Sequence, residues 1–286
     1  MSIYLNQAAV TLFDTQVHTG YQEGYDLRGL VREKSVDGAA TVSFPVMGKA
    51  IARQKAIHTD VVPADVTHAP VTATMQDWYA ADYTDIFAKK KVNFDEVSEL
   101  ANILKMGCGR RIDNILITAL NAATPAATIS TDIGGSGTDM NYEKFLEIMG
   151  GLDDGGVPQD GRTLVMNHRS YRSLLKDPEF ISSDYGQMRL DQSSKGNVKP
   201  FLAFNIVTIN DRVESDGTRL GLPKSGDVVT AFGFHRDAVG MGFNMELSSE
   251  VNYVPTKLAY LTTCKFSAGA VAIDGDGIVK ASVTQA

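Results

Sequence analysis

The sequence has few of the residues on which many catalytic and secreted proteins depend. Only two of its 286 residues are cysteine, Cys108 and Cys264, so at most one disulfide is possible and we expect a reducing compartment. The five histidines show neither an i, i+4 pair nor a His-Glu-x-x-His motif, which argues against a metal site. The first residues lack the basic and apolar regions of a signal peptide, and no stretch is apolar enough for a membrane span. These absences predict a soluble protein, made inside the cell, with no membrane partner.

Positive charge is also scarce. Lysine and arginine number 27 against 34 aspartates and glutamates, which gives a net charge of −7. A surface of that sign does not hold DNA tightly by neutralising phosphates. The basic clusters are Lys89–Lys91 and Arg110–Arg111. We interpret them as a solvated face, and a contact with acidic neighbours or packaged nucleic acid is the alternative.

No motif in the sequence assembles a catalytic site. Residues 240–242 (Gly-Met-Gly) lack the third glycine of a dinucleotide fingerprint, and residues 134–137 fit neither a nucleophile elbow nor a phosphate loop. Residues 274–277 (Asp-Gly-Asp-Gly) lack the other ligands of a calcium loop. Cys108 lies on an apolar stripe, and His235 is more typical of a structural histidine than of a base. We therefore predict no catalytic residue, no cofactor and no metal.

The amino-terminal part is extended in character. Residues 1–37 show no sustained period and cannot bury a core of their own. Residues 41–46 and 71–76 alternate polar and apolar as strands do, with a first turn expected at residues 47–49. The apolar face of this ribbon is thin, and an isolated two-stranded ribbon is marginal in water. We expect a neighbouring subunit to hold it.

Residues 93–123 predict one long helix, about 45 Å at 1.5 Å per residue. Asn93 is the expected cap, with Glu96 three residues later, and Pro125 marks the end. Polar residues, Asp113 among them, occupy the other faces. The apolar face steps by three or four through Val97, Leu100, Leu104, Cys108, Ile112, Ile115, Leu116 and Leu120.

The remaining chain predicts a mixed α+β region with polar loops. Helices are expected at 141–152 and, capped by Asn167 or Ser170, through Leu175. Strands are expected at 163–166, 204–209 and 227–234, a strand-rich stretch at 239–265, and a hairpin of 270–273 with 278–283 around the turn 274–277. Segments 181–200 and 214–226 are expected to be loops.

This order of elements resembles the major capsid protein of tailed bacteriophages, with the Hong Kong 97-type fold. The residues that carry the resemblance to podovirus-type coat proteins are Ser43–Lys49, Asp82–Asp85, Thr163–Tyr171 and Gly233–Gly240. The ordered set covers nearly the whole chain. It implies an N-terminal arm at 1–37, an extended loop at 38–72, a peripheral domain at 73–135 and 238–266 with the long helix as its spine, and an axial domain at 136–237 and 267–286. The resemblance also places loops 181–200 and 214–226 at the hexamer and pentamer axes.

The resemblance implies a structural protein rather than an enzyme. Its copies would self-assemble into hexamers and pentamers of an icosahedral shell around double-stranded DNA, in the virion after assembly in the host cytoplasm. Expected partners are a separate scaffolding protein, a portal, a decoration protein and weakly held DNA on the inner face. Family members that cross-link use a lysine of the extended loop, where Lys49 and Lys55 lie here. No acidic catalyst or asparagine partner can be assigned, so we make no prediction of cross-linking. The candidate assembly residues are Phe44, Val46, Lys49, Ile51, Lys55, Met75, Trp78, Arg110, Arg111, His235 and Arg236.

Two other functions stay open at this point. An encapsulin-type nanocompartment would have the same fold but enclose a protein cargo and no DNA. An α/β hydrolase or transferase would need a convergent acid–base pair, and the sequence offers none.

Overall fold

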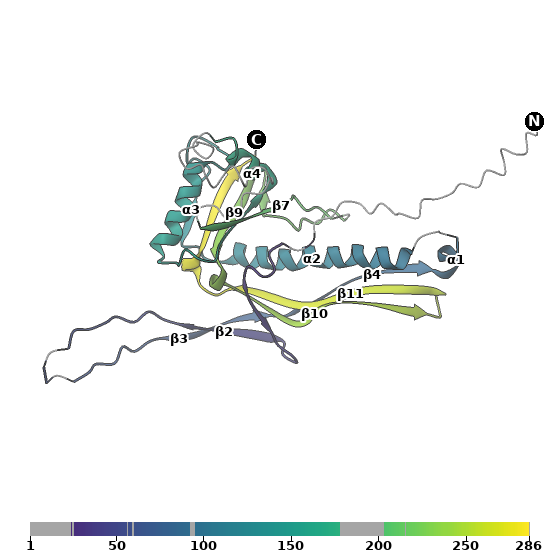
Figure 1. The fold of residues 1–286 in the computed structure, drawn as a ribbon, viewed down its shortest axis with the longest axis horizontal. Coiled ribbons are helices and arrows are strands. Elements are labelled where there is room, and N and C mark those ends of the chain that lie inside the picture. The colour runs from purple at the N-terminus through teal and green to yellow at the C-terminus, as the bar shows by residue number, and fades with distance from the viewer. Residues whose placement is uncertain are drawn as a thin grey trace, which may run out of the picture.

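The computed structural model describes residues 24, 26–55, 57–58, 60–91, 95–177, 203–214 and 216–285. Figure 1 shows a long layer of strands with one long helix along it, a more compact body above one end of that helix, and a ribbon that projects from the layer. The predicted mixed α+β class is confirmed. Most of the arm and the loop 181–200 lie outside the described residues.

The long layer is a four-stranded sheet in the order β1-β10-β11-β4. Its strands are β1 (Arg32–Ser35), β10 (Val239–Val254), β11 (Ala259–Ala272) and β4 (Gln76–Asp85). β1 runs parallel to β10, and the other pairs are antiparallel. β4 continues into the short helix α1 (Ile86–Lys89), and the long helix α2 (Glu96–Ala122) packs along β11 and β4.

The predicted apolar stripe of α2 is confirmed in its second half, where Cys108, Ile112, Leu116 and Leu120 are buried. The helix begins later than expected, after Asp95, whose carboxylate accepts a hydrogen bond from Ser98 Oγ at 2.6 Å. The expected cap, Asn93, lies outside the described residues. The prediction that Asp113 faces away from the core is wrong.

The compact body is a second, six-stranded sheet in the order β5-β12-β9-β6-β7, with β8 paired to β9. Its strands are β5 (Ala127–Ile129), β6 (Arg162–Asn167), β7 (Phe204–Ile209), β8 (Lys224–Ser225), β9 (Val228–His235) and β12 (Ile278–Thr284). Helix α3 (Tyr142–Asp154), capped by the side chain of Asn141, packs on β12 and β5. Helix α4 (His168–Leu174) is capped by Asn167, the first of the two residues expected to do so.

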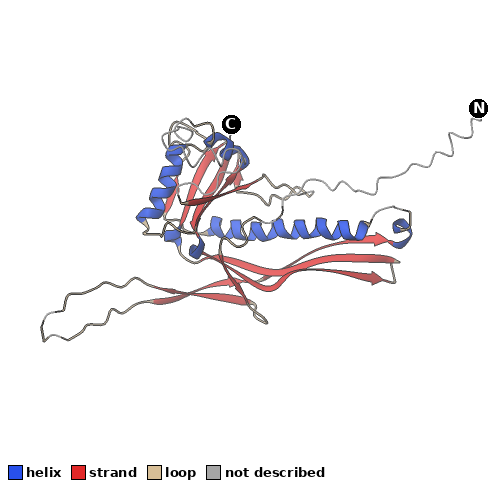
Figure 2. Cartoon of the chain, in the orientation of Figure 1, coloured by secondary structure: helices blue, strands red, loops and turns tan. Residues whose placement is uncertain are grey.

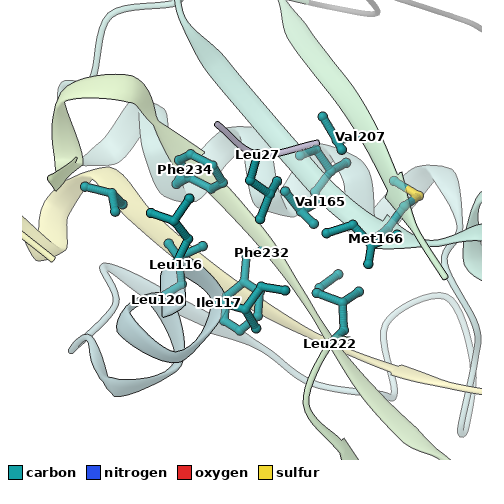
Figure 3. Packing of buried hydrophobic residues seen from close by; sticks show 14 of the residues in the cluster. Leu27, Leu116, Ile117, Leu120, Val165, Met166, Val207, Leu222, Phe232 and Phe234 are labelled. Atoms are coloured by element: carbon teal, nitrogen blue, oxygen red, sulfur yellow. The ribbon is translucent and has the colours of Figure 1, made fainter. Parts of the chain in front are cut away.

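One continuous hydrophobic core joins the two sheets. Figure 3 shows Leu116, Ile117 and Leu120 of α2 close to Phe232 and Phe234 of β9. The same core includes Leu27, Met241 and Phe266, from the arm, β10 and β11 respectively. The carboxyl-terminal half of α2 therefore belongs to both layers.

The predicted hairpin 270–283 is wrong. β11 ends the long sheet, whereas β12 pairs with β9 and β5 in the compact sheet. The segment between them, with the short 3-10 helix Gly275–Gly277, is held by hydrogen bonds from Ile273 and Asp274 to the carbonyl of Ala238. Ala238 lies in the 3-10 helix Arg236–Ala238, where the chain crosses between the sheets in the other direction. Alternation and an Asp-Gly turn identify strands, but they do not say whether two successive strands pair.

The projecting ribbon consists of β2 (Thr41–Met47) and β3 (His68–Thr74), which pair antiparallel over seven residues. The expected turn at 47–49 is wrong, because the backbone N–H of Gly48 donates to the carbonyl of Thr67 at 2.9 Å and so continues the pairing. The chain turns later, at residues 57–58. The result is a longer projection than its strands alone would give.

Candidate assembly surfaces

The base of the ribbon is held by its own chain. Val42, Phe44 and Ala73 are buried in a small separate core. Partly buried neighbours pack against it, among them Val271 of β11 and Ile273 just after this strand. Glycines of β10 make room for it: a Cβ at Gly240 would lie 2.7 Å from the ring of Phe44. The Gly-Met-Gly sequence at 240–242 is therefore explained by the close packing of the ribbon's base on β10 rather than by nucleotide binding.

Beyond this base the ribbon exposes apolar side chains. The exposed fractions are 80% for Ile51, 88% for Ile57, 73% for Val61 and 61% for Val62. Figure 2 shows the segment 48–67 as loop, extending away from both sheets. Burial is worth about 25 cal/mol for each Å² of apolar surface, so these side chains favour a covering surface. The described part of the chain does not supply one.

The structure places the other loop candidates as follows. Lys55 is exposed, and Lys49 is also exposed, with its Nζ 3.4 Å from a carboxylate oxygen of Asp276. Val46 is half-buried. Phe44 is 1% exposed, so it contributes to assembly only by holding the ribbon's base in place.

Further candidates lie on or beside the long sheet. Trp78 of β4 is half-buried, with the Arg111 guanidinium carbon 4.5 Å from its ring centroid. Met75 is half-buried beside Val42 and Phe44. The Lys89–Lys91 run is exposed where its side chains are described, and the ammonium of Lys89 lies 5.3 Å from the ring centroid of Tyr260.

His235 holds a turn. Its Nε2 lies 2.8 Å from the carbonyl oxygen of Asp160, and its Nδ1 accepts the backbone N–H of Asp237 at 3.2 Å. Since one nitrogen donates and the other accepts, a neutral ring satisfies both contacts. Arg236 beside it is exposed. This geometry agrees with the structural interpretation of His235.

A buried polar cluster lies between α2, residues 26–27 of the arm and the chain after β7. The carboxylate of Asp113 is fully buried and accepts the backbone N–H groups of Asp26 and Leu27 at 3.0 and 3.1 Å. The guanidinium of Arg212 lies 2.7 Å from Asp113 and 2.8 Å from the Asp26 carboxylate. Burial raises the pKa of Asp113, and the contacts with Arg212 and the two N–H groups oppose that rise.

The same region holds Glu214, the first residue of the predicted loop 214–226. Arg110 of α2 donates to both carboxylate oxygens of Glu214, at 2.6 and 3.0 Å. The first residue of this loop therefore contacts the long helix, and the expected position of the loop at an axis of symmetry stays a prediction. Asp26, Arg212 and Glu214 were not predicted from the sequence, because an ion pair between distant segments leaves no periodic signal.

The described residues contain no group of three His, Cys, Asp or Glu placed to hold a metal ion. Cys108 and Cys264 are both buried free thiols, and Cys108 Sγ lies 3.8 Å from the carbonyl oxygen of Cys264. Burial raises the pKa of Cys108 to about 12, so the thiol stays protonated and unreactive. None of the described helices is both long and apolar enough to cross a membrane.

Comparison with known proteins decides the family. A family model described as phage capsid protein matches residues 5–285. This chain belongs to the phage capsid protein family. Its role is that of a structural phage capsid protein, as the resemblance implied. A search of curated proteins finds no match.

Solved capsid structures share the fold over nearly their whole length. The capsid of the cyanophage P-SCSP1u aligns with a TM-score of 0.76 at 13% identity, covering 99% of this chain and 95% of that one. The acid-stable capsid of Helicobacter pylori bacteriophage KHP30 gives 0.75 at 11% identity and covers 99% and 98%. The capsid of Ralstonia phage GP4 gives 0.70 at 11% identity, with 98% and 96% covered. The Hong Kong 97-type fold of this capsid protein is thereby confirmed.

Proposed function

We propose that this capsid protein self-assembles into hexamers and pentamers of an icosahedral shell that encloses double-stranded DNA. The observation that carries the proposal is the segment 48–67, whose large apolar side chains are exposed in the single chain. A neighbouring copy covers them in the shell, and closure of the shell leaves no copy with an uncovered segment. The protein acts as a building unit and catalyses no reaction.

The division into two sheets supports the four-part organisation. We assign the arm to 1–37, the extended loop to 38–72, the peripheral domain to the long sheet with α2, and the axial domain to the compact sheet. The chain passes between the sheets at 123–126, 236–238 and 273–277. We place the domain borders at these passages rather than at 135 and 266, since β5 lies in the compact sheet and β11 continues to Ala272 in the long one.

The partners follow from the same assignment. A separate scaffolding protein, a portal and a decoration protein complete the head, which assembles in the host cytoplasm and becomes part of the virion. The net charge of −7 supports weak contact with packaged DNA. Shells that enclose protein and no DNA would instead indicate the encapsulin-type alternative.

The test replaces the exposed apolar surface of the loop. We expect the double variant I51D/I57D to remain folded, because both side chains are exposed, and to lose shell formation at least tenfold. Sedimentation velocity and electron microscopy of the purified protein measure this, with circular dichroism as the check on folding. The variant I51L, which keeps an apolar side chain of the same size, should assemble like the wild type. Normal shells from I51D/I57D, or a wild-type chain that stays a monomer or dimer, would overturn the proposal.

A further inference from the structure

Asp113 joins two segments that are 186 residues apart. We call residues 26–31 the arm root and residues 210–214 with 216–222 the tongue. The arm root donates two backbone N–H groups to the Asp113 carboxylate, and the tongue provides the Arg212 guanidinium. Arg212 also contacts the side chain of Asp26, so α2, arm root and tongue share one closed polar cluster.

The arm root and the tongue are each built to stay in place. Leu27 and Val31 of the arm root are buried in the main core, and Leu27 lies beside Val165 in Figure 3. Within the tongue, the N–H of Leu220 donates to the carbonyl of Arg212 at 2.7 Å, and Leu222 is buried. A Cβ at Gly221 would lie 2.9 Å from the carbonyl oxygen of Asn210, so the two sides of the tongue approach closely.

Neither segment can leave the cluster without cost to the other. If the arm root moves away, Asp113 loses two donors while buried, and Arg212 loses the Asp26 carboxylate. If the tongue moves away, the carboxylates of Asp113 and Asp26 both lose the guanidinium of Arg212. A buried charge that loses its partners is strongly disfavoured. The arm root therefore stabilises the position of the tongue by the same free energy by which the tongue stabilises the position of the arm root.

We infer that Asp113 is a positioning residue that couples the arm root to the tongue, so that the positions of these two segments change together. The partner on the other side of the coupling is the compact sheet, because the tongue continues directly from β7 and leads into β8. A displacement of the arm root is thereby transmitted through the tongue to the compact sheet.

Hydrogen–deuterium exchange of the full chain tests this coupling. The variant D26N removes the arm-root carboxylate that Arg212 contacts and changes no residue of the tongue. We expect amides of residues 212–220 to exchange at least tenfold faster in D26N than in wild type. The variant D113N should accelerate exchange in both the arm root and the tongue, because an asparagine has one acceptor oxygen for three donors.

The matched control is R28Q. Arg28 lies in the same arm root, and its substitution breaks the half-exposed ion pair with Glu246 of β10 but leaves Asp113 unchanged. It should change exchange in the tongue less than twofold. If D113N does not fold, R212K replaces it, since a lysine keeps the charge but cannot contact both carboxylates with separate nitrogens. Faster exchange confined to the arm root in D26N and D113N would overturn the coupling.

The outcome is separable from that of the proposed function. Exchange is measured within one copy, whereas assembly is measured by sedimentation of the wild type. A wild type that forms no shells but shows the coupled exchange would overturn the proposed function alone. Shells of normal size with an unaffected tongue in D26N and D113N would overturn the coupling alone.

Discussion

At the scale of single residues, small and charged side chains determine how closely the segments of this protein approach. Gly240 and Gly242 are in one strand, and each faces a residue of the ribbon's base, Phe44 or Val42. Asp113 draws the arm root onto the long helix through two N–H groups. In the sequence the two glycines are only part of an incomplete nucleotide-binding motif, and Asp113 is only a charged residue within a helix. Neither glycine spacing nor helical periodicity indicates which distant segment packs against these residues.

The substitution G240A tests the close approach at the ribbon's base. The added Cβ would lie 2.7 Å from the Phe44 ring and 2.9 Å from Ile273 Cδ1, so we expect a loss of about 1–3 kcal/mol in the free energy of unfolding. Urea denaturation of the unassembled chain measures it. The control is G150A in α3, where nothing lies within 4 Å of the added Cβ and helix propensity favours alanine. Equal effects from the two substitutions would contradict the assignment.

The pKa of Asp113 predicts how stability depends on pH. Its pKa is raised in the folded chain, so folding favours the protonated form relative to the unfolded chain. As the pH falls through the raised pKa towards the ordinary value of about 3.9, the carboxyl group therefore adds stability. We expect the free energy of unfolding of the wild type, minus that of D113N, to increase as the pH falls from 7 to 4. A constant or decreasing difference in urea titrations would contradict the raised pKa.

At the scale of elements, sequence periodicity predicted whether a segment is a helix or a strand better than it predicted which other segment that element pairs with. The helix around residues 96–122, the strand at 204–209 and the Asn167 cap follow from local side chains, which act within one turn or one strand. The pairing of 270–273 with 278–283 failed because the short linker carries the chain between two sheets instead of reversing it. The contact of Glu214 with α2 was missed for a related reason: the Arg110–Glu214 ion pair forms between residues 104 apart in sequence.

At the scale of the whole molecule, folding and assembly depend on different surfaces. The main core draws on the arm root, α2, α3 and both sheets, whereas the ribbon's base has its own small core. None of the described residues of segment 48–67 belongs to either core. The sequence predicted that a neighbouring subunit holds the ribbon, whereas the structure shows that its own chain holds the base. The glycines that seat this base on β10 became clear only from the structure.

This separation predicts that the loop can be removed without unfolding the protein. The backbone pair Gly48–Thr67 closes the paired region, so replacing residues 49–66 with Asn-Gly joins the strands through a two-residue turn. We expect the thermal midpoint of the unassembled variant to stay within about 3 °C of the wild type, which corresponds to roughly 1 kcal/mol for a chain of this size. Shell formation should be lost, since the surface that a neighbour covers is gone.

A control that replaces Ile51, Ile57, Val61 and Val62 with leucine keeps the loop's length and apolar character, and it should assemble. A shortened variant that unfolds would show that the loop supports its own chain, and one that forms normal shells would show that neighbours are held by other surfaces.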